Sequence, residues 1–160
     1  MSNLADIEDR LAIRDLIDRW SDAVNEHDWE QFASCFTEDG VWDVGAPFHL
    51  RFEGNKSIVE DVSALIKAQY IVVQMPHCPV IKVNGDTATS RVTMHEFMRG
   101  PDNSGMQMWG TYYDDLVRTD VGWRFKLRVY RTAYYDDKPP EGEILRRFHD
   151  SSQIIEEVTK

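Results

Sequence analysis

Residues 84–118 read NGDTATSRVTMHEFMRGPDNSGMQMWGTYYDDLVR, and this stretch determines which architecture the chain can adopt. Two segments within it, 87–99 and 106–118, are rich in β-branched and aromatic residues and follow the two-residue period of a β-strand. The dipeptide Asn84-Gly85 is a strong signal for a tight hairpin turn, and the polar loop 100–105 separates the two segments. The stretch therefore predicts two long antiparallel strands.

The same composition continues on both sides of this stretch. Segments 70–83 and 123–134 are also rich in β-branched and aromatic residues, and Asp120-Val121-Gly122 provides a further reversal. The sequence therefore predicts four long strands that form an antiparallel meander.

Before residue 70 the apolar residues follow a helical period instead. The predicted elements there are helices at 4–24, 28–36 and 57–67 and a short strand at 41–44. Asp28 is a candidate N-cap of the second helix, and Gln31, three residues later, has the position from which a side chain can reach back in a capping box. The first two helices are expected to form a hairpin.

Composition and charge narrow the possible functions. The chain has 160 residues, 42% of them hydrophobic, which suits one globular domain. Its formal charge of −10 repels phosphate groups and anionic lipid headgroups, so we expect no nucleic-acid partner and no membrane association. The chain shows no apolar run of about 18 residues and no signal-peptide pattern at its start, so a cytoplasmic location is expected.

Ligand-type residues are not spaced as in a metal site. Cys35 and Cys78 lie far apart, with no second cysteine or histidine at zinc-finger spacing, and are expected to be small core residues. The sequence therefore predicts no metal and no cofactor.

Several short motifs together resemble the SnoaL-like group of the nuclear transport factor 2-like superfamily. They are Ala12-Ile13-Arg14-Asp15-Leu16, Asp28-Trp29-Glu30, Phe36-Thr37-Glu38-Asp39-Gly40-Val41-Trp42, Val83-Asn84-Gly85-Asp86-Thr87-Ala88 and Gly122-Trp123-Arg124-Phe125. The resemblance covers roughly residues 7–134. It implies an α+β fold in which a cone-shaped, curved antiparallel sheet packs on three N-terminal helices. The expected domain is 1–135, followed by a tail, 136–160, that packs loosely or on a neighbouring subunit.

The resemblance is specific for the fold but is compatible with several activities. Members of this superfamily include scytalone dehydratase, hexachlorocyclohexane dehydrochlorinase, bile-acid dehydratase, polyketide cyclases, a ketosteroid isomerase and the small subunits of ring-hydroxylating dioxygenases. The first expectation is a cofactor-independent lyase acting on a hydrophobic, aromatic or polycyclic small molecule, as in the catabolism of aromatic compounds. A non-catalytic small subunit or ligand-binding module is the alternative, and an isomerase or polyketide cyclase is a further one.

The lyases that this chain resembles use a histidine base oriented by an aspartate. The resemblance places His77 at the histidine position and Asn25 at the aspartate position, where a neutral amide stabilises an imidazolium much less than a carboxylate does. Arg128 matches an arginine that helps to hold the charged site in the dehydrochlorinase. An inward Arg128 needs a partner, and a position facing water at a subunit boundary is equally compatible with the sequence. His77, Asn25 and Arg128 are thus the expected catalytic residues.

Mainly apolar positions are expected to form the substrate pocket. The expected substrate-binding residues are Trp20, Val24, Trp42, Met94, Met108 and Tyr112. The resemblance also implies a homotrimer, in which outward-facing residues of the long strands, such as Phe97, Trp109 and Tyr113, pack against neighbouring subunits.

Overall fold

The structure is a computed structural model in which residues 4–147 are described. The elements follow the order α1 (Leu4–Glu26), α2 (Trp29–Ser34), β1 (Phe36–Val44), β2 (Leu50–Glu53), α3 (Asn55–Lys67), β3 (Ile71–Pro76), β4 (Val80–Asn84), β5 (Thr87–Arg99), β6 (Gly105–Thr119) and β7 (Gly122–Asp136). Among the described residues, none of the helices combines the length and the hydropathy that a membrane span requires.

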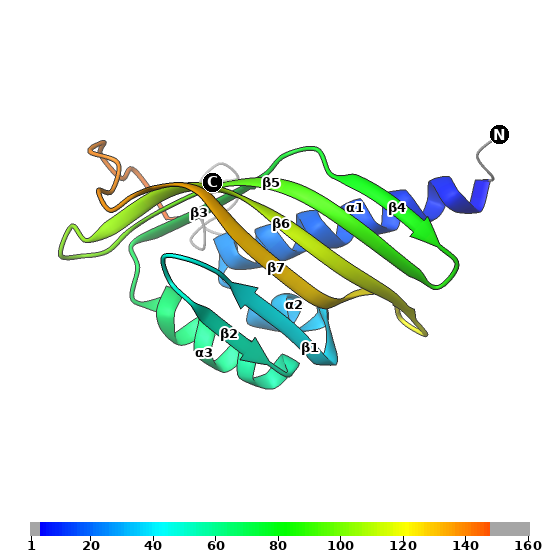
Figure 1. Cartoon of the computed structure of the whole chain (residues 1–160). Helices are drawn as coiled ribbons and strands as arrows, with labels where there is room; N and C mark the ends of the chain where they lie inside the picture. Colours follow the sequence, from blue (N-terminus) through cyan, green and yellow to red (C-terminus); the bar gives the residue numbers. More distant parts are fainter. Residues whose placement is uncertain (1–3, 148–160) are drawn as a thin grey trace, which may run out of the picture.

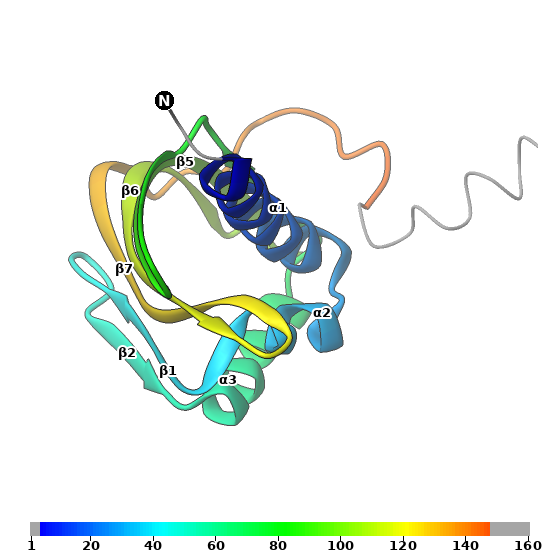
Figure 2. The same ribbon diagram turned by 90° about the vertical axis from the view of Figure 1, so that its right-hand side faces the viewer.

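The strands form one curved sheet in the order β2-β1-β7-β6-β5-β3, and β4 also pairs with β5. Figures 1 and 2 show the sheet bending around the three helices, which lie on its concave side. This arrangement confirms the predicted α+β class and the three helices packed on a curved sheet. The sheet is not antiparallel throughout, because β1 runs parallel to β7.

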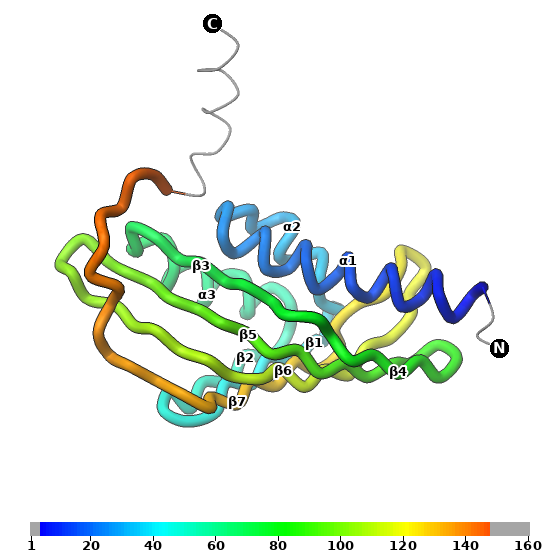
Figure 3. The backbone as a smooth tube through the Cα atoms, turned by 90° about the horizontal axis from the view of Figure 1, so that it is seen from above, coloured from blue at the N-terminus to red at the C-terminus, as the bar shows by residue number. Residues whose placement is uncertain are grey.

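The predicted strand 70–83 is wrong as a single element, since the structure divides it into β3 and β4. Both strands pair with β5, and the segment 77–79 between them is not part of the sheet. The break falls between Pro76 and Pro79, and proline has no N–H with which to continue a ladder of hydrogen bonds. β3 is the last strand in the sheet order, so it lies at an edge of the sheet, beside α1 (Figure 3).

The capping of α2 agrees only in part with the sequence-based expectation. The Asp28 carboxylate accepts a hydrogen bond of 2.9 Å from the backbone N–H of Gln31, so the predicted N-cap is confirmed. The Gln31 side chain does not complete a capping box. Its Nε2 atom donates instead to the Arg19 carbonyl and to the Asp22 carboxylate, which ties α2 to α1.

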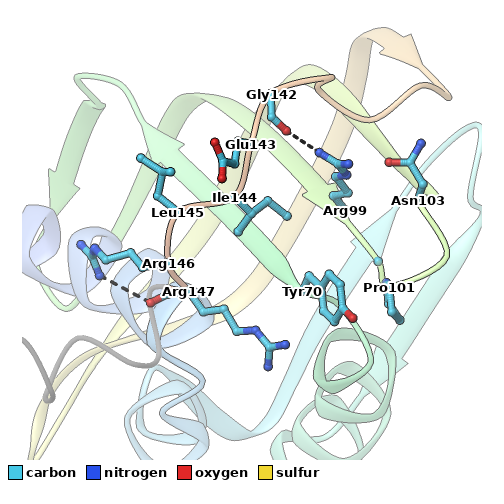
Figure 4. Close-up of a pocket in the computed structure, with 11 residues that line it drawn as sticks. Tyr70, Arg99, Pro101, Asn103, Gly142, Glu143, Ile144, Leu145, Arg146 and Arg147 are labelled. Atoms are coloured by element: carbon cyan, nitrogen blue, oxygen red, sulfur yellow. Dashed lines mark hydrogen bonds between the residues drawn. The ribbon is translucent and has the colours of Figure 1, made fainter.

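After β7, the described part of the C-terminal segment packs on its own chain. Figure 4 shows residues 142–147 passing over the sheet near Tyr70 and Arg99. Arg99 Nη1 donates to the carbonyl oxygens of Pro140 and Gly142, and the Arg147 guanidinium lies 4.8 Å from the centre of the Tyr70 ring. Residues 148–160 of the expected tail lie outside the described residues, and its packing on a neighbouring subunit stays a prediction.

Candidate active site

A cavity of about 250 Å³ lies between the concave face of the sheet and α3. It is smaller than the pockets that hold drug-sized ligands, which typically exceed about 300 Å³. Its walls are mainly apolar and aromatic, with a few polar side chains among them. The lining residues are Trp42, Val44, Phe48, Leu50, Phe52, Val62, Leu65, Ile66, Gln69, Gln74, Glu96, Met98, Met106, Met108, Tyr112 and Tyr130.

Glu96 is the ionisable side chain of this cavity that is best suited to acid–base chemistry. It projects from the inner face of β5, and only 5% of its surface is exposed. Its carboxylate accepts a hydrogen bond of 2.6 Å from Gln74 Nε2. Burial raises the pKa of Glu96 to about 7, and the Gln74 hydrogen bond opposes this rise only in part. Glu96 therefore exists in both protonation states near neutral pH, as a general acid–base residue requires.

Asn25 and Gln74 connect this carboxyl group to α1. The Asn25 amide donates a hydrogen bond of 3.1 Å to the Gln74 carbonyl, and its oxygen accepts one of 2.7 Å from the Gln74 N–H. Both bonds satisfy backbone groups at the free edge of β3. Asn25 thus fixes the backbone of Gln74, whose side chain holds Glu96.

Tyr130 of β7 lines the cavity from the same inner face of the sheet as Glu96, and Gly110 of β6 lies between their strands. A Cβ atom built on Gly110 would lie 2.3–2.6 Å from the Cζ, Oη and Cε2 atoms of Tyr130, so the absence of a side chain at Gly110 leaves room for the Tyr130 ring across β6. Burial raises the pKa of Tyr130, and the charge of Glu96 raises it further. Tyr130 is therefore a protonated phenol at neutral pH.

Arg128 is buried behind this wall and does not line the cavity. Its Nε atom lies 3.4 Å from Asp114 Oδ1, and its guanidinium carbon is 4.0–4.2 Å from the ring centres of Trp20, Tyr112 and Phe125. The structure therefore selects the inward, paired position of Arg128 over the water-facing one. Asp114 is buried as well, and burial raises its pKa although the charge of Arg128 opposes this rise.

The expected pairing of His77 with Asn25 is not present in the structure. His77 is exposed in the segment between β3 and β4, its backbone N–H bonds to the Thr93 carbonyl, and it is not among the residues that line the cavity. The neighbour of Asn25 is Gln74, three residues earlier. The irregular segment between Pro76 and Pro79 carries His77 beyond the part of β3 that faces α1.

The expected substrate-binding residues divide into two groups. Trp42, Met108 and Tyr112 line the cavity. The other three, Trp20, Val24 and Met94, are buried in the core without lining it. Trp20 supports the wall from behind, because its ring packs edge-on against Trp42 and Tyr112 at centroid distances of 5.7 and 5.2 Å.

Sequence reasoning missed four polar lining residues: Gln69, Gln74, Glu96 and Tyr130. A signal for Glu96 was present, because Glu96 shares the inner face of its strand with Met94 and with the apolar Val92. A carboxylate on an apolar strand face is costly unless it is partnered or protonated, so such a residue is a candidate for function. Within residues 4–147, no three histidine, cysteine or acidic side chains gather as a metal site requires.

Many solved structures share this fold, among them three that are described by an activity. A Novosphingobium aromaticivorans protein described as an aromatic ring hydroxylase is 26% identical and has a TM-score of 0.76, over 81% of this chain and 93% of that one. A protein described as a scytalone dehydratase from the same organism is 19% identical, with a TM-score of 0.74 over 86% and 96% of the two chains. The type 2 hexachlorocyclohexane dehydrochlorinase LinA is 18% identical, with a TM-score of 0.76 over 89% and 95%.

Similarity in sequence identifies the family. The uncharacterized protein Rv2910c of Mycobacterium tuberculosis is 30% identical over 131 residues, which are 81% of this chain and 88% of the relative. The uncharacterized protein Mb2934c of Mycobacterium bovis matches to the same extent. Residues 5–129 match the model of the SnoaL-like domain, and the chain therefore belongs to the SnoaL-like domain family.

Proposed function

We propose that the chain is a lyase that eliminates water or another small leaving group from a small, mainly apolar and aromatic molecule held in the cavity. The observation that carries this proposal is Glu96, a carboxyl group buried in the cavity with a pKa of about 7. A group that titrates near the working pH can remove a proton and return it within one turnover.

Glu96 would act as follows. Its carboxylate takes a proton from a carbon atom of the substrate, and the electron pair of the broken C–H bond forms a carbon–carbon double bond. The bond from the adjacent carbon to the leaving group breaks, and the leaving group departs with that bond's electrons. When hydroxide leaves, it takes the proton from Glu96 and becomes water. The step balances without an added oxidant, reductant or cofactor.

The three residues that the sequence predicted to be catalytic have different roles in this proposal. Asn25 is a positioning residue, because it acts on Glu96 only through Gln74. Arg128 supports the cavity wall from behind through its contact with the Tyr112 ring. Glu96 replaces His77 as the base, since His77 lies outside the cavity lining.

Two kinds of comparison support the class of reaction. The chain belongs to a family whose fold it shares with proteins described as a dehydratase and a dehydrochlorinase. Both names denote eliminations that remove a proton and a leaving group from adjacent carbons. The mainly apolar lining of the cavity fits an uncharged, hydrophobic substrate.

A substrate screen with a matched pair of variants tests the proposal. Hydroxylated and halogenated cyclic compounds are incubated with the protein, and the new conjugated double bond is followed by ultraviolet absorbance. Glu96→Gln should reduce turnover by roughly 10² to 10⁴. Glu60→Gln, at an exposed position on α3, is the control and should leave turnover unchanged. Equal turnover by the Glu96→Gln variant and the unmodified protein would contradict the proposal.

A non-catalytic role is the second candidate. It is favoured by the 26% identity to the Novosphingobium protein described as an aromatic ring hydroxylase, and by the missing contact between His77 and Asn25. In that case the chain would be a small subunit that requires an iron-containing large subunit. Purification of the tagged chain from its own cells with a stoichiometric iron protein would favour this role.

A further inference from the structure

A second hollow, of about 490 Å³, lies where the C-terminal segment crosses the start of β3 and the end of β5 (Figure 4). It shares no lining residue with the cavity that contains Glu96. Three arginines line it, Arg99, Arg146 and Arg147, and we call it the arginine hollow. Its one acidic lining residue is Glu143. In a chain with a formal charge of −10, this local excess of positive charge makes the hollow a candidate site for an anion.

Hydrogen bonds hold the two parts of the chain that form the arginine hollow. The Tyr70 N–H donates a hydrogen bond of 2.8 Å to the Arg99 carbonyl, which joins the start of β3 to the end of β5. Arg99 Nη1 donates to the carbonyl oxygens of Pro140 and Gly142. The hollow is therefore formed by the sheet on one side and by the C-terminal segment on the other, with Arg99 joining them.

Two guanidinium groups in the arginine hollow have donors left over. Arg147 lies over the Tyr70 ring, and among residues 4–147 its guanidinium makes no hydrogen bond and no ion pair. Contact with an aromatic face leaves the N–H groups at the edge of a guanidinium free to bind an acceptor. The Nε and Nη2 atoms of Arg99 also lack a partner in the described part of the chain, where Glu143 pairs with neither arginine.

Neutral donors and apolar side chains complete the lining. The Tyr70 hydroxyl and the Asn103 amide can each donate a hydrogen bond, and Pro101, Ile144 and Leu145 supply apolar surface. A carboxylate has two oxygen atoms, which one arginine can satisfy, whereas a phosphate monoester has three acceptor oxygens and a charge of about −1.5 to −2. Donors from several side chains therefore suit a phosphate group, and the apolar surface suits an organic group attached to it.

We propose that the arginine hollow binds a small organic phosphate monoester, with the phosphate group between Arg99 and Arg147 and the organic group against Pro101 and Ile144. The inference goes beyond the proposed function, because it assigns a second ligand to a site apart from the cavity of Glu96. Such a ligand connects the end of β5 to the C-terminal segment, so its binding also holds that segment on the sheet.

Calorimetric titration with phenyl phosphate tests this assignment. At a pH slightly above neutral the probe is mainly a dianion, because its second pKa is about 6. The unmodified protein should bind it at a single site. Arg147→Ala should weaken binding roughly 10- to 100-fold, as expected for lost hydrogen bonds to a charged group. Arg147→Lys should restore only part of the affinity, because an ammonium group lacks the planar fork of a guanidinium.

Matched controls separate a built site from a response to charge. Arg14→Ala removes the same charge at an exposed position on α1, outside the arginine hollow, and should bind phenyl phosphate as the unmodified protein does. Phenol, which lacks the phosphate group, should not bind at the same concentration. Inorganic phosphate should bind more weakly than phenyl phosphate, because it cannot contact the apolar lining. Circular dichroism of Arg147→Ala establishes that the variant is folded.

Three results would overturn the inference: no saturable binding of phenyl phosphate by the unmodified protein, equal binding by folded Arg147→Ala, or equal weakening by Arg14→Ala and Arg147→Ala. Inorganic phosphate that bound as tightly as phenyl phosphate would overturn the assignment of an organic ligand. The proposed function stands or falls separately, on the turnover of Glu96→Gln.

Discussion

Gln74 Nε2 donates a hydrogen bond of 2.6 Å to the carboxylate of Glu96, and both side chains are buried in the cavity wall. The bond joins adjacent strands, since Gln74 of β3 pairs directly with Glu96 of β5. It leaves the Gln74 Oε1 atom without a partner among the described residues. While Gln74 Nε2 holds the Glu96 carboxylate, Gln74 Oε1 can accept a hydrogen bond from a donor group of a bound ligand.

The ionisation of Glu96 should make stability depend on pH. Its pKa rises from 4.5 in the unfolded chain to about 7 in the folded one, so the folded state binds the proton more tightly. The free energy of unfolding should therefore fall as the pH rises from 4.5 to about 7, by roughly 3 kcal/mol from this group. Urea denaturation of the unmodified protein and of Glu96→Gln at several pH values measures the difference. An equal pH dependence in both proteins would contradict the assignment.

Asn25 should matter for stability as well as for activity. Asn25→Ala leaves the N–H and C=O of Gln74 without their partners at the edge of β3, which should cost roughly 1–3 kcal/mol. Asn84→Ala, at an exposed position at the end of β4, should change stability much less. Chemical denaturation compares the two variants. If Asn25→Ala proved no less stable than Asn84→Ala, these backbone hydrogen bonds would not contribute as described.

His77 is the base that the family resemblance implies, and its substitution distinguishes that assignment from Glu96. Because it is exposed and does not line the cavity, His77→Ala should leave turnover unchanged. A loss of roughly 10² to 10⁴ in the rate would instead assign the base to His77. Steady-state kinetics on a substrate identified by the screen provides the measurement.

The outer face of the sheet exposes large side chains, and we propose that it is covered in a homotrimer. Trp109, Tyr113 and Tyr134 are more than a third exposed, and His95 stacks on Trp109 with 4.1 Å between the ring centres. Exposed apolar patches of this kind commonly mark subunit interfaces. Light scattering should give three times the chain mass, and Trp109→Glu should reduce it to that of one chain. A monomeric unmodified protein at micromolar concentration would rule the trimer out.

Periodicity was sufficient for the main elements of the fold. The stripe that includes Leu16, Trp20 and Val24 is buried along α1, and the alternation in residues 87–99 sets the two faces of β5. It did not reveal β2, whose four residues lie too close to the next helix to show a pattern. Nor did it show that Leu4, Ile7 and Leu11 stay exposed, because burial depends on what the rest of the chain places beside them.

The site was harder to predict than the fold. Trp42 and Tyr112 followed from family resemblance, and Met108 from the strand face that it shares with Tyr112; all three lie on regular strands and line the cavity. The residue beside Asn25 did not, since residues 77–79 between β3 and β4 are not part of the sheet, and the two-residue period of a strand does not continue across them. The role of Gly110 also depends on a long-range contact with Tyr130 that no local pattern encodes.

The titration of Glu96 itself can be followed by nuclear magnetic resonance, with glutamate labelled at its side-chain carboxyl carbon. One resonance should titrate with a midpoint of about pH 7 and disappear in Glu96→Gln. If every glutamate carboxyl group titrated near its ordinary value of 4.5, Glu96 would be ionised throughout the neutral range and could not act as the proton-transferring residue proposed for this cavity.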